Sequence, residues 1–267
     1  MVRCNRCGNE NPPEPFVCAF CGAKLKIEKI ERIKFFERPE KKWKRPQRVL
    51  TRYVQVFIKP SELFWDLRYD EKRRGAIYIL LMNGALVGLI GMVLLGRVNF
   101  PHDTLADSMI YLSTFLSFFL FGLLYHLLLF GVLSYLYKIV GSRQGGRRSR
   151  HSFIAMLYAF FPSVVGNAIN ILVLLIALPT ASFSGFNVYG DLARLFQDPQ
   201  AQLAWQITGI ISFIIYGGWI PLLAGLCVRS LHDSSTFRSI VWSYIVGIIM
   251  GILVFLTSGI FIESAVP

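Results

Sequence analysis

The sequence predicts an all-α polytopic membrane protein, in which a five-helix transmembrane bundle follows amphipathic interfacial helices and a small cysteine-rich module at the N-terminus. Three observations lead to this prediction. Of the 267 residues, 54% are hydrophobic and only 16% are charged, whereas ordinary soluble domains carry about 25% charged residues. Five apolar segments reach the length needed to cross a bilayer, which is about 20 residues. The basic residues gather in alternate loops between these segments.

The N-terminal module, residues 1–24, carries the most specific local pattern. Two Cys-x-x-Cys-Gly motifs supply four thiolates, which can close a tetrahedral metal site; the ligands are Cys4, Cys7, Cys18 and Cys21. The spacing favours a structural zinc ion, because four protein ligands leave no position for a catalytic water. A pair of disulfides is disfavoured in the cytoplasm, and a redox dithiol would not need the second motif.

This module resembles the short zinc ribbons common at the N-termini of prokaryotic, especially archaeal, proteins. Such ribbons bind proteins or nucleic acid, or only cap a terminus, so function does not follow from their fold. Residues 25–46 are dense in both charges and predict a charged linker. Its Lys and Arg residues serve either solubility or contact with anionic lipid head groups.

Two amphipathic helices precede the first span. Apolar residues at helical spacing occupy Val49 to Ile58, Pro60 interrupts the pattern, and Ser61 to Arg68 resumes it. Both segments are too polar to span a bilayer. We expect them either to lie in the membrane interface or to pack on the cytoplasmic face of the bundle.

The five spans are expected at about residues 75–95, 111–137, 153–178, 207–228 and 240–262. The loop between the second and third spans is strongly basic, with Arg143, Arg147, Arg148 and Arg150. Short loops of this kind stay in the cytoplasm, where they meet anionic lipids. The alternation of basic and poorly basic loops therefore predicts a multi-pass protein of the cell membrane with a cytoplasmic N-terminus and an external C-terminus.

A few polar groups lie inside the spans. His126, Ser163, Asn167 and Asn170 either line a polar path or join helices by hydrogen bonds, and we favour the second. The spans contain no Asp, Glu, Lys or Arg, which weighs against an ion pump. Small residues on helix faces, such as Gly84 and Gly88, permit close packing within the chain or between copies in a homo-oligomer. The sequence contains no P-loop, H-E-x-x-H or G-x-S-x-G motif.

The segment Lys59-Pro-Ser-Glu-Leu-Phe-Trp65, the five spans, and the Gly-rich loop that leads to Ser152-Phe153 and then Pro162 resemble the Yip family of Ypt/Rab-interacting membrane proteins. The resemblance covers about Pro46 to Pro267, so residues 47–267 form the expected Yip-like membrane domain. Eukaryotic relatives act in vesicle traffic and bind small GTPases, whereas the ribbon and the length point to a prokaryotic, archaeal type. The resemblance implies an integral membrane scaffold or adaptor, and it transfers no catalytic residue.

The sequence therefore predicts a non-enzymatic scaffold whose cytoplasmic ribbon binds or positions a protein partner at the membrane. A small transporter or channel that uses the polar residues of the third span is the alternative. A weaker alternative is contact with RNA or the ribosome through the ribbon, because Arg3, Arg6 and Lys24 flank its cysteines.

Overall fold

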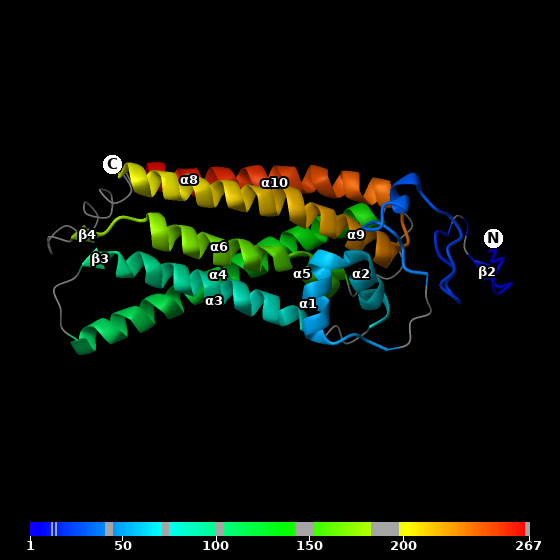
Figure 1. Cartoon of the computed structure of the whole chain (residues 1–267), viewed down its shortest axis with the longest axis horizontal. Coiled ribbons are helices and arrows are strands. Elements are labelled where there is room, and N and C mark those ends of the chain that lie inside the picture. Colours follow the sequence, from blue (N-terminus) through cyan, green and yellow to red (C-terminus); the bar gives the residue numbers. More distant parts are fainter. Residues whose placement is uncertain are drawn as a thin grey trace. The chain divides into compact units, whose positions relative to one another are not determined.

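The computed structural model is mainly helical (Figure 1). It describes residues 1–11, 13, 15–40, 45–70, 75–99, 104–142, 152–182 and 198–264. The chain forms two compact units: unit 1 comprises Met1–Ile77, Phe130–Phe161 and Ile220–Gly247, and unit 2 comprises Tyr78–Leu129, Pro162–Trp219 and Ile248–Pro267. The basic loop with Arg143, Arg147, Arg148 and Arg150 lies outside the described residues, so its expected role stays a prediction.

Five helical segments are long and apolar enough to cross a membrane: Ala76–Gly96, Ser108–Ile139, Phe153–Ala177, Pro199–His232 and Thr236–Leu256. They confirm the predicted all-α, multi-pass architecture. The first is α3 (Ala76–Gly96), the second lies in α4 (Thr104–Ser142), and the last lies in α10 (Thr236–Ser264). Each span presents large aliphatic or aromatic side chains outward, as expected of helices that face lipid.

The third and fourth spans each consist of more than one helical element. The third comprises α5 (Ser152–Ala159) and α6 (Phe161–Ala177). The helix is interrupted between them, just before Pro162. Proline lacks an amide donor and interrupts a helix in this way. The fourth comprises α8 (Pro199–Phe213), a π-helix, η3 (Ile214–Trp219), and α9 (Ile220–His232). The Asp198 side chain caps α8 by accepting hydrogen bonds from the amides of Gln200 (2.7 Å) and Ala201 (3.3 Å).

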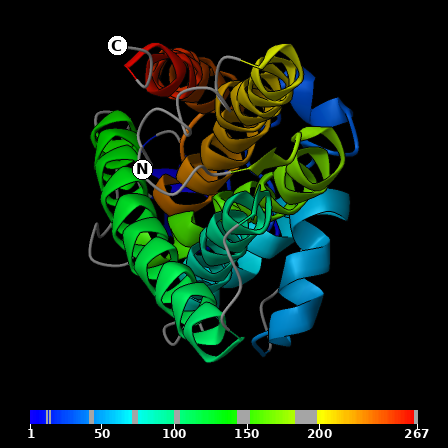
Figure 2. The ribbon, with the colours of Figure 1, turned by 90° about the vertical axis from the view of Figure 1, so that its left-hand side faces the viewer.

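Unit 2 is built around close contacts between its helices. Gly88 and Gly91 of α3 lie directly against Phe115 and Phe118 of α4, where an added Cβ would come within 2.7 Å and 2.4 Å of the rings. Figure 2 shows these two helices side by side in teal and green. Leu174, Leu178, Ala201 and Ala204 form a buried cluster against α3. Short parallel pairing joins β3 (Val98–Asn99) to β4 (Ala181–Ser182).

The small-residue face of α3 is thus used within the chain. The same holds for Gly251 of α10, whose added Cβ would lie 2.9 Å from the Cα of Gly217. The expected homo-oligomer through small-residue helix faces stays a prediction.

Unit 1 contains the N-terminal module and two short helices, α1 (Val49–Ile58) and α2 (Pro60–Tyr69). The module has a two-stranded antiparallel sheet of β1 (Val2–Arg3) and β2 (Glu10–Asn11), and a 3₁₀ helix, η1 (Lys29–Arg32), follows it. Helix α2 packs against α9 and buries Leu63, Phe64 and Leu67 completely. Of the two expectations for the amphipathic segments, packing on the bundle therefore holds for α2.

Candidate metal centre and its attachment

The two cysteine motifs fold into matching turns. In the first, the amide of Gly8 donates a 2.9 Å hydrogen bond to the carbonyl of Cys4; in the second, the amide of Gly22 donates a 3.1 Å bond to that of Cys18. Both glycines have positive φ, 74° and 73°, a conformation that other residues adopt only at a cost. Each turn therefore brings the two cysteines of its motif to the same side of the backbone.

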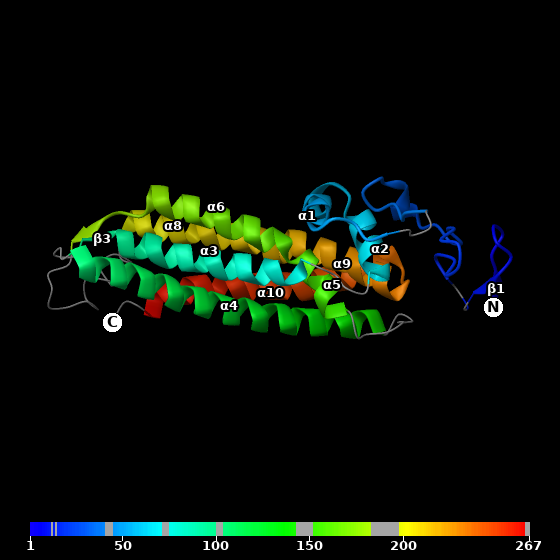
Figure 3. The ribbon, with the colours of Figure 1, turned by 90° about the horizontal axis from the view of Figure 1, so that it is seen from below.

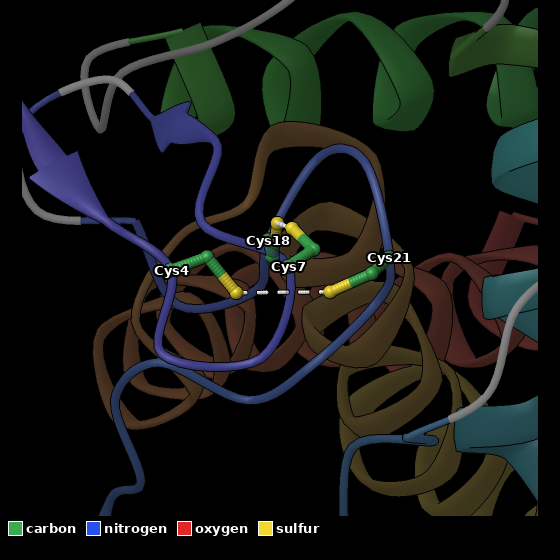
Figure 4. Close-up of side chains that lie close together, drawn as sticks. All are labelled: Cys4, Cys7, Cys18 and Cys21. Atoms are coloured by element: carbon green, nitrogen blue, oxygen red, sulfur yellow. Dashed lines mark hydrogen bonds between the residues drawn. The ribbon is translucent and has the colours of Figure 1, made fainter.

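The turns place all four sulfur atoms within 4.8 Å of one another. The Sγ atoms of Cys4 and Cys21 are 3.7 Å apart, as are those of Cys7 and Cys18 (Figure 4). A tetrahedral thiolate site with zinc–sulfur bonds of about 2.3 Å has its sulfurs roughly 3.8 Å apart. These four cysteines could therefore hold one metal ion, and their arrangement fits a zinc site.

Backbone amides favour the thiolate form that binds metal at Cys4 and Cys18. At Cys7 the amide of Asn9 acts in the same direction, but burial and the neighbouring thiols outweigh it and raise the pKa to about 12. The amide of Arg6 points at Cys4 Sγ over 3.4 Å. Burial disfavours the Cys18 thiolate, but hydrogen bonds from the amides of Cys21 and Phe20 outweigh it and lower the pKa of this thiol to about 6. The fifth cysteine, Cys227, is buried in α9 and is not part of the cluster.

The module is attached to the membrane domain through an aromatic contact. Phe16 and Val17, which directly precede the second motif, are buried against Trp65 of α2, with Tyr69 packed beside them. The guanidinium of Arg38 lies 4.4 Å from the centre of the Phe16 ring, a favourable cation–π arrangement. The sequence did not reveal whether module and bundle touch, and this contact shows that they do.

The charged segment that follows the module is also attached. Oε2 of Glu28 accepts hydrogen bonds from the amides of Thr236 (2.7 Å) and Phe237 (3.1 Å), so it caps the start of α10. Glu31 and Arg38 are buried and paired at 2.6 Å. These two charged side chains of the predicted linker, residues 25–46, are therefore buried and paired, and they have little contact with solvent.

Arg229 joins this segment to the helices of unit 1. Its guanidinium is buried and donates to the carbonyl of Phe36 (2.6 Å), to Oγ1 of Thr236 (2.9 Å) and to Oγ of Ser61 (2.7 Å). Residues 28–38, called the strap below, are therefore bonded to α2, α9 and α10 at once. Arg229 directly follows the fourth predicted span, residues 207–228, and no spacing pattern links it to residue 36.

The polar residues of the spans form a separate chain of hydrogen bonds in unit 2. Oδ1 of Asn83 accepts from Ser163 Oγ (3.0 Å) and from Asn167 Nδ2 (2.8 Å). The His126 ring bonds to the Gly122 carbonyl (2.8 Å) and approaches Asn167 (3.5 Å). Asn170 instead donates to Ser212 (3.4 Å). The structure thus brings His126, Ser163 and Asn167 together around Asn83, and their mutual bonds favour a role in joining helices.

The part of the chain that is similar to known proteins is the membrane domain. The sequence model of a protein family, described as the Yip1 domain, matches residues 54–257, which is more than half of the chain. The four cysteines lie before the matched range. No curated protein and no solved structure matches the chain.

Proposed function

The chain belongs to the Yip1 domain family, and we propose that it is a non-enzymatic membrane scaffold whose zinc-loaded ribbon positions a protein partner at the cytoplasmic face of the cell membrane. The family assignment and the five apolar helices support a membrane-associated role. The ribbon, its metal and its partner are the proposed part.

The metal in this proposal is a structural Zn²⁺ bound by Cys4, Cys7, Cys18 and Cys21. The sulfur spacing supports it, and four thiolate ligands leave no open position for a substrate. The module has little core of its own: Cys4, Cys18 and Ala23 are its main buried cluster. Metal binding would therefore supply much of its folding free energy, roughly 10–16 kcal/mol in comparable peptides.

One observation carries the positioning role: the ribbon is bonded to the membrane domain and does not hang from a free tether. Phe16 and Val17 pack on Trp65, and the strap is bonded to Arg229 and to the start of α10. A module that only capped the terminus would have no need of both attachments. Together they fix the direction in which the ribbon points.

The remaining surface of the ribbon offers a contact for a partner. Phe20, between the cysteines of the second motif, is 59% exposed. Arg3 and Arg6 of the first motif are also exposed. An exposed aromatic ring on a module that also exposes basic groups suits a protein partner with apolar and acidic side chains.

The test is a crosslinking pull-down of the whole protein from native membranes. Three forms are compared: wild type, Phe20→Ala, and a form in which all four ligand cysteines are Ser. Phe20→Ala leaves every sulfur in place, so it should retain the metal while losing the partner. Cys227→Ser is the matched control, because it removes a thiol outside the cluster.

We expect one protein partner to be captured by wild type and Cys227→Ser and lost from the other two. Capture of the same proteins by all four forms would refute the adaptor role and direct attention to transport through the bundle. Ribonuclease-sensitive capture of ribosomal RNA that weakens with salt would instead support the nucleic-acid alternative.

A further inference from the structure

We propose that α1 lies in the interface of the leaflet where the first and third spans begin, with three aliphatic side chains inserted among anionic lipids. Leu50, Val54 and Ile58 are spaced four residues apart and are 77%, 56% and 65% exposed. Residues at this spacing share one face of a helix, and we call them the aliphatic stripe. The proposal concerns a lipid-binding surface and is independent of the ribbon's proposed partner.

The opposite face of α1 fixes its rotation. Arg52 is buried and donates hydrogen bonds to Oδ2 of Asp66 (2.7 Å) and Oδ2 of Asp70 (2.5 Å) of the α2 segment. Val56, one turn further along, is fully buried. A buried arginine held by two carboxylates cannot turn outward without leaving charges unpaired. The aliphatic stripe therefore has to lie on the face of α1 that points away from α2.

The contacts of α1 also fix its height along the spans. The Tyr53 hydroxyl donates a 2.7 Å hydrogen bond to the carbonyl of Gly75, the residue before α3 begins. Its ring stacks on Phe161 of the third span, with the ring centres 4.8 Å apart. Phe161 is the first residue of α6, directly before Pro162. Helix α1 is therefore held beside the start of α3 and the junction of α5 and α6.

The direction of α1 agrees with this placement. It runs across the axes of α5 and α9, as the view of Figure 1 and the perpendicular view of Figure 3 both show. The first and third spans begin with exposed apolar side chains, Ile77, Phe153 and Ile154, as expected of helix ends that face lipid. A helix that crosses the spans at this height lies along the membrane surface.

The charges that border the stripe select the lipid. Arg45 and Arg48 are exposed before α1, and Lys59 is exposed directly after it, 3.8 Å from the carboxylate of Glu62. Residues 45–59 contain no Asp or Glu. Basic groups beside an inserted apolar face are attracted to anionic head groups. The occupant of this surface is therefore an anionic phospholipid leaflet.

Photocrosslinking of the whole protein in vesicles tests the proposal. A benzophenone amino acid replaces Val54, and the same amino acid replaces Ile27 in the matched control, because Ile27 is an aliphatic residue of similar exposure, 65%, outside the stripe. The vesicles contain phosphatidylcholine either alone or mixed with phosphatidylglycerol. Mass spectrometry then identifies what each position captures.

We expect position 54 to capture phospholipid several-fold more than position 27, with phosphatidylglycerol enriched over its share of the mixture. Arg48→Gln combined with Lys59→Gln should abolish that enrichment while leaving the protein folded, because both side chains are exposed. Equal capture at the two positions, or a crosslink from position 54 to a second copy of the chain, would overturn the proposal. Lipid capture without any preference for phosphatidylglycerol would overturn its anionic part.

Discussion

Nε of Arg38 lies 2.6 Å from Oε1 of Glu31, and both side chains are almost completely buried. Nη1 of Arg229 lies 3.8 Å from the same carboxylate oxygen. One carboxylate of the strap thus faces two buried guanidinium groups, one from the strap itself and one from α9. This arrangement joins the N-terminal segment to the membrane helices.

Replacing Glu31 by Gln should strongly destabilise unit 1. The substitution leaves Arg38 and Arg229 buried without their carboxylate, and breaking a buried pair in this way costs about 3–5 kcal/mol. Thermal unfolding of the purified protein in detergent measures the effect. Glu37→Gln is the control, because Glu37 pairs with Lys24 at the surface and should matter little. Equal melting temperatures for the two variants would show that the buried pair does not hold the strap.

The spans could be predicted from the sequence, whereas the strap could not. A span needs only a long apolar run, so residues 75–95 and 153–178 predicted the helices at Ala76–Gly96 and Phe153–Ala177 closely. Some helices extend beyond the predicted spans because a capping residue starts them earlier. Helix α8 begins at Pro199, after its cap Asp198 and eight residues before the predicted span 207–228. Glu28 bonds to the amide of Thr236 and Glu31 pairs with Arg229, both about 200 residues away, and no local pattern encodes such a pair.

The cysteine cluster was predictable for the opposite reason. Its ligands are local, and their spacing alone brings the four sulfurs together. The attachment of the ribbon depends instead on Phe16 and Trp65, two aromatic residues without any periodic signal. Sequence reasoning therefore reached the cysteine cluster and missed the surface that holds it in place.

Replacing Trp65 by Ala should release the ribbon from α2 without loss of metal. The substitution removes the surface on which Phe16 and Val17 pack, and truncating a buried Trp typically costs about 3–5 kcal/mol. Hydrogen–deuterium exchange should speed up in residues 15–25, while metal analysis stays unchanged. Trp242→Ala, which truncates a 49% exposed ring of α10, is the control and should leave this exchange slow. Unaltered exchange in Trp65→Ala would argue against the attachment.

Gly247→Ala should destabilise the packing of α10 on α9. An added Cβ would lie 1.9 Å from Cγ of Pro221, and overpacking of this kind costs about 1–3 kcal/mol. Gly131→Ala offers a matched control in a helix, because no atom of the described residues outside its own stretch of helix lies within 4 Å of its added Cβ. That variant should be neutral or slightly more stable, since alanine favours helix. Melting temperatures that fall equally would contradict this packing.

Asn83→Ala should destabilise unit 2 more than Asn170→Ala does. Asn83 supplies the oxygen that both Ser163 and Asn167 share, and removing a shared acceptor costs about 1–3 kcal/mol. Asn170 makes one long bond of 3.4 Å, and its buried Oδ1 has no partner in the described part of the chain. The order of the two melting temperatures checks this, and the reverse order would weaken the helix-joining role of the cluster.

The measurement that most directly tests the central claim is the metal content of the whole purified protein, obtained by mass spectrometry of the elements. We expect one zinc ion per chain in wild type, in Cys227→Ser and in Phe20→Ala, and none when Cys4 and Cys21 are both Ser, because two thiolates cannot close the site. A protein that holds no zinc in any form, or that keeps its zinc without Cys4 and Cys21, would contradict a four-cysteine zinc ribbon, and with it the scaffold role proposed for this module.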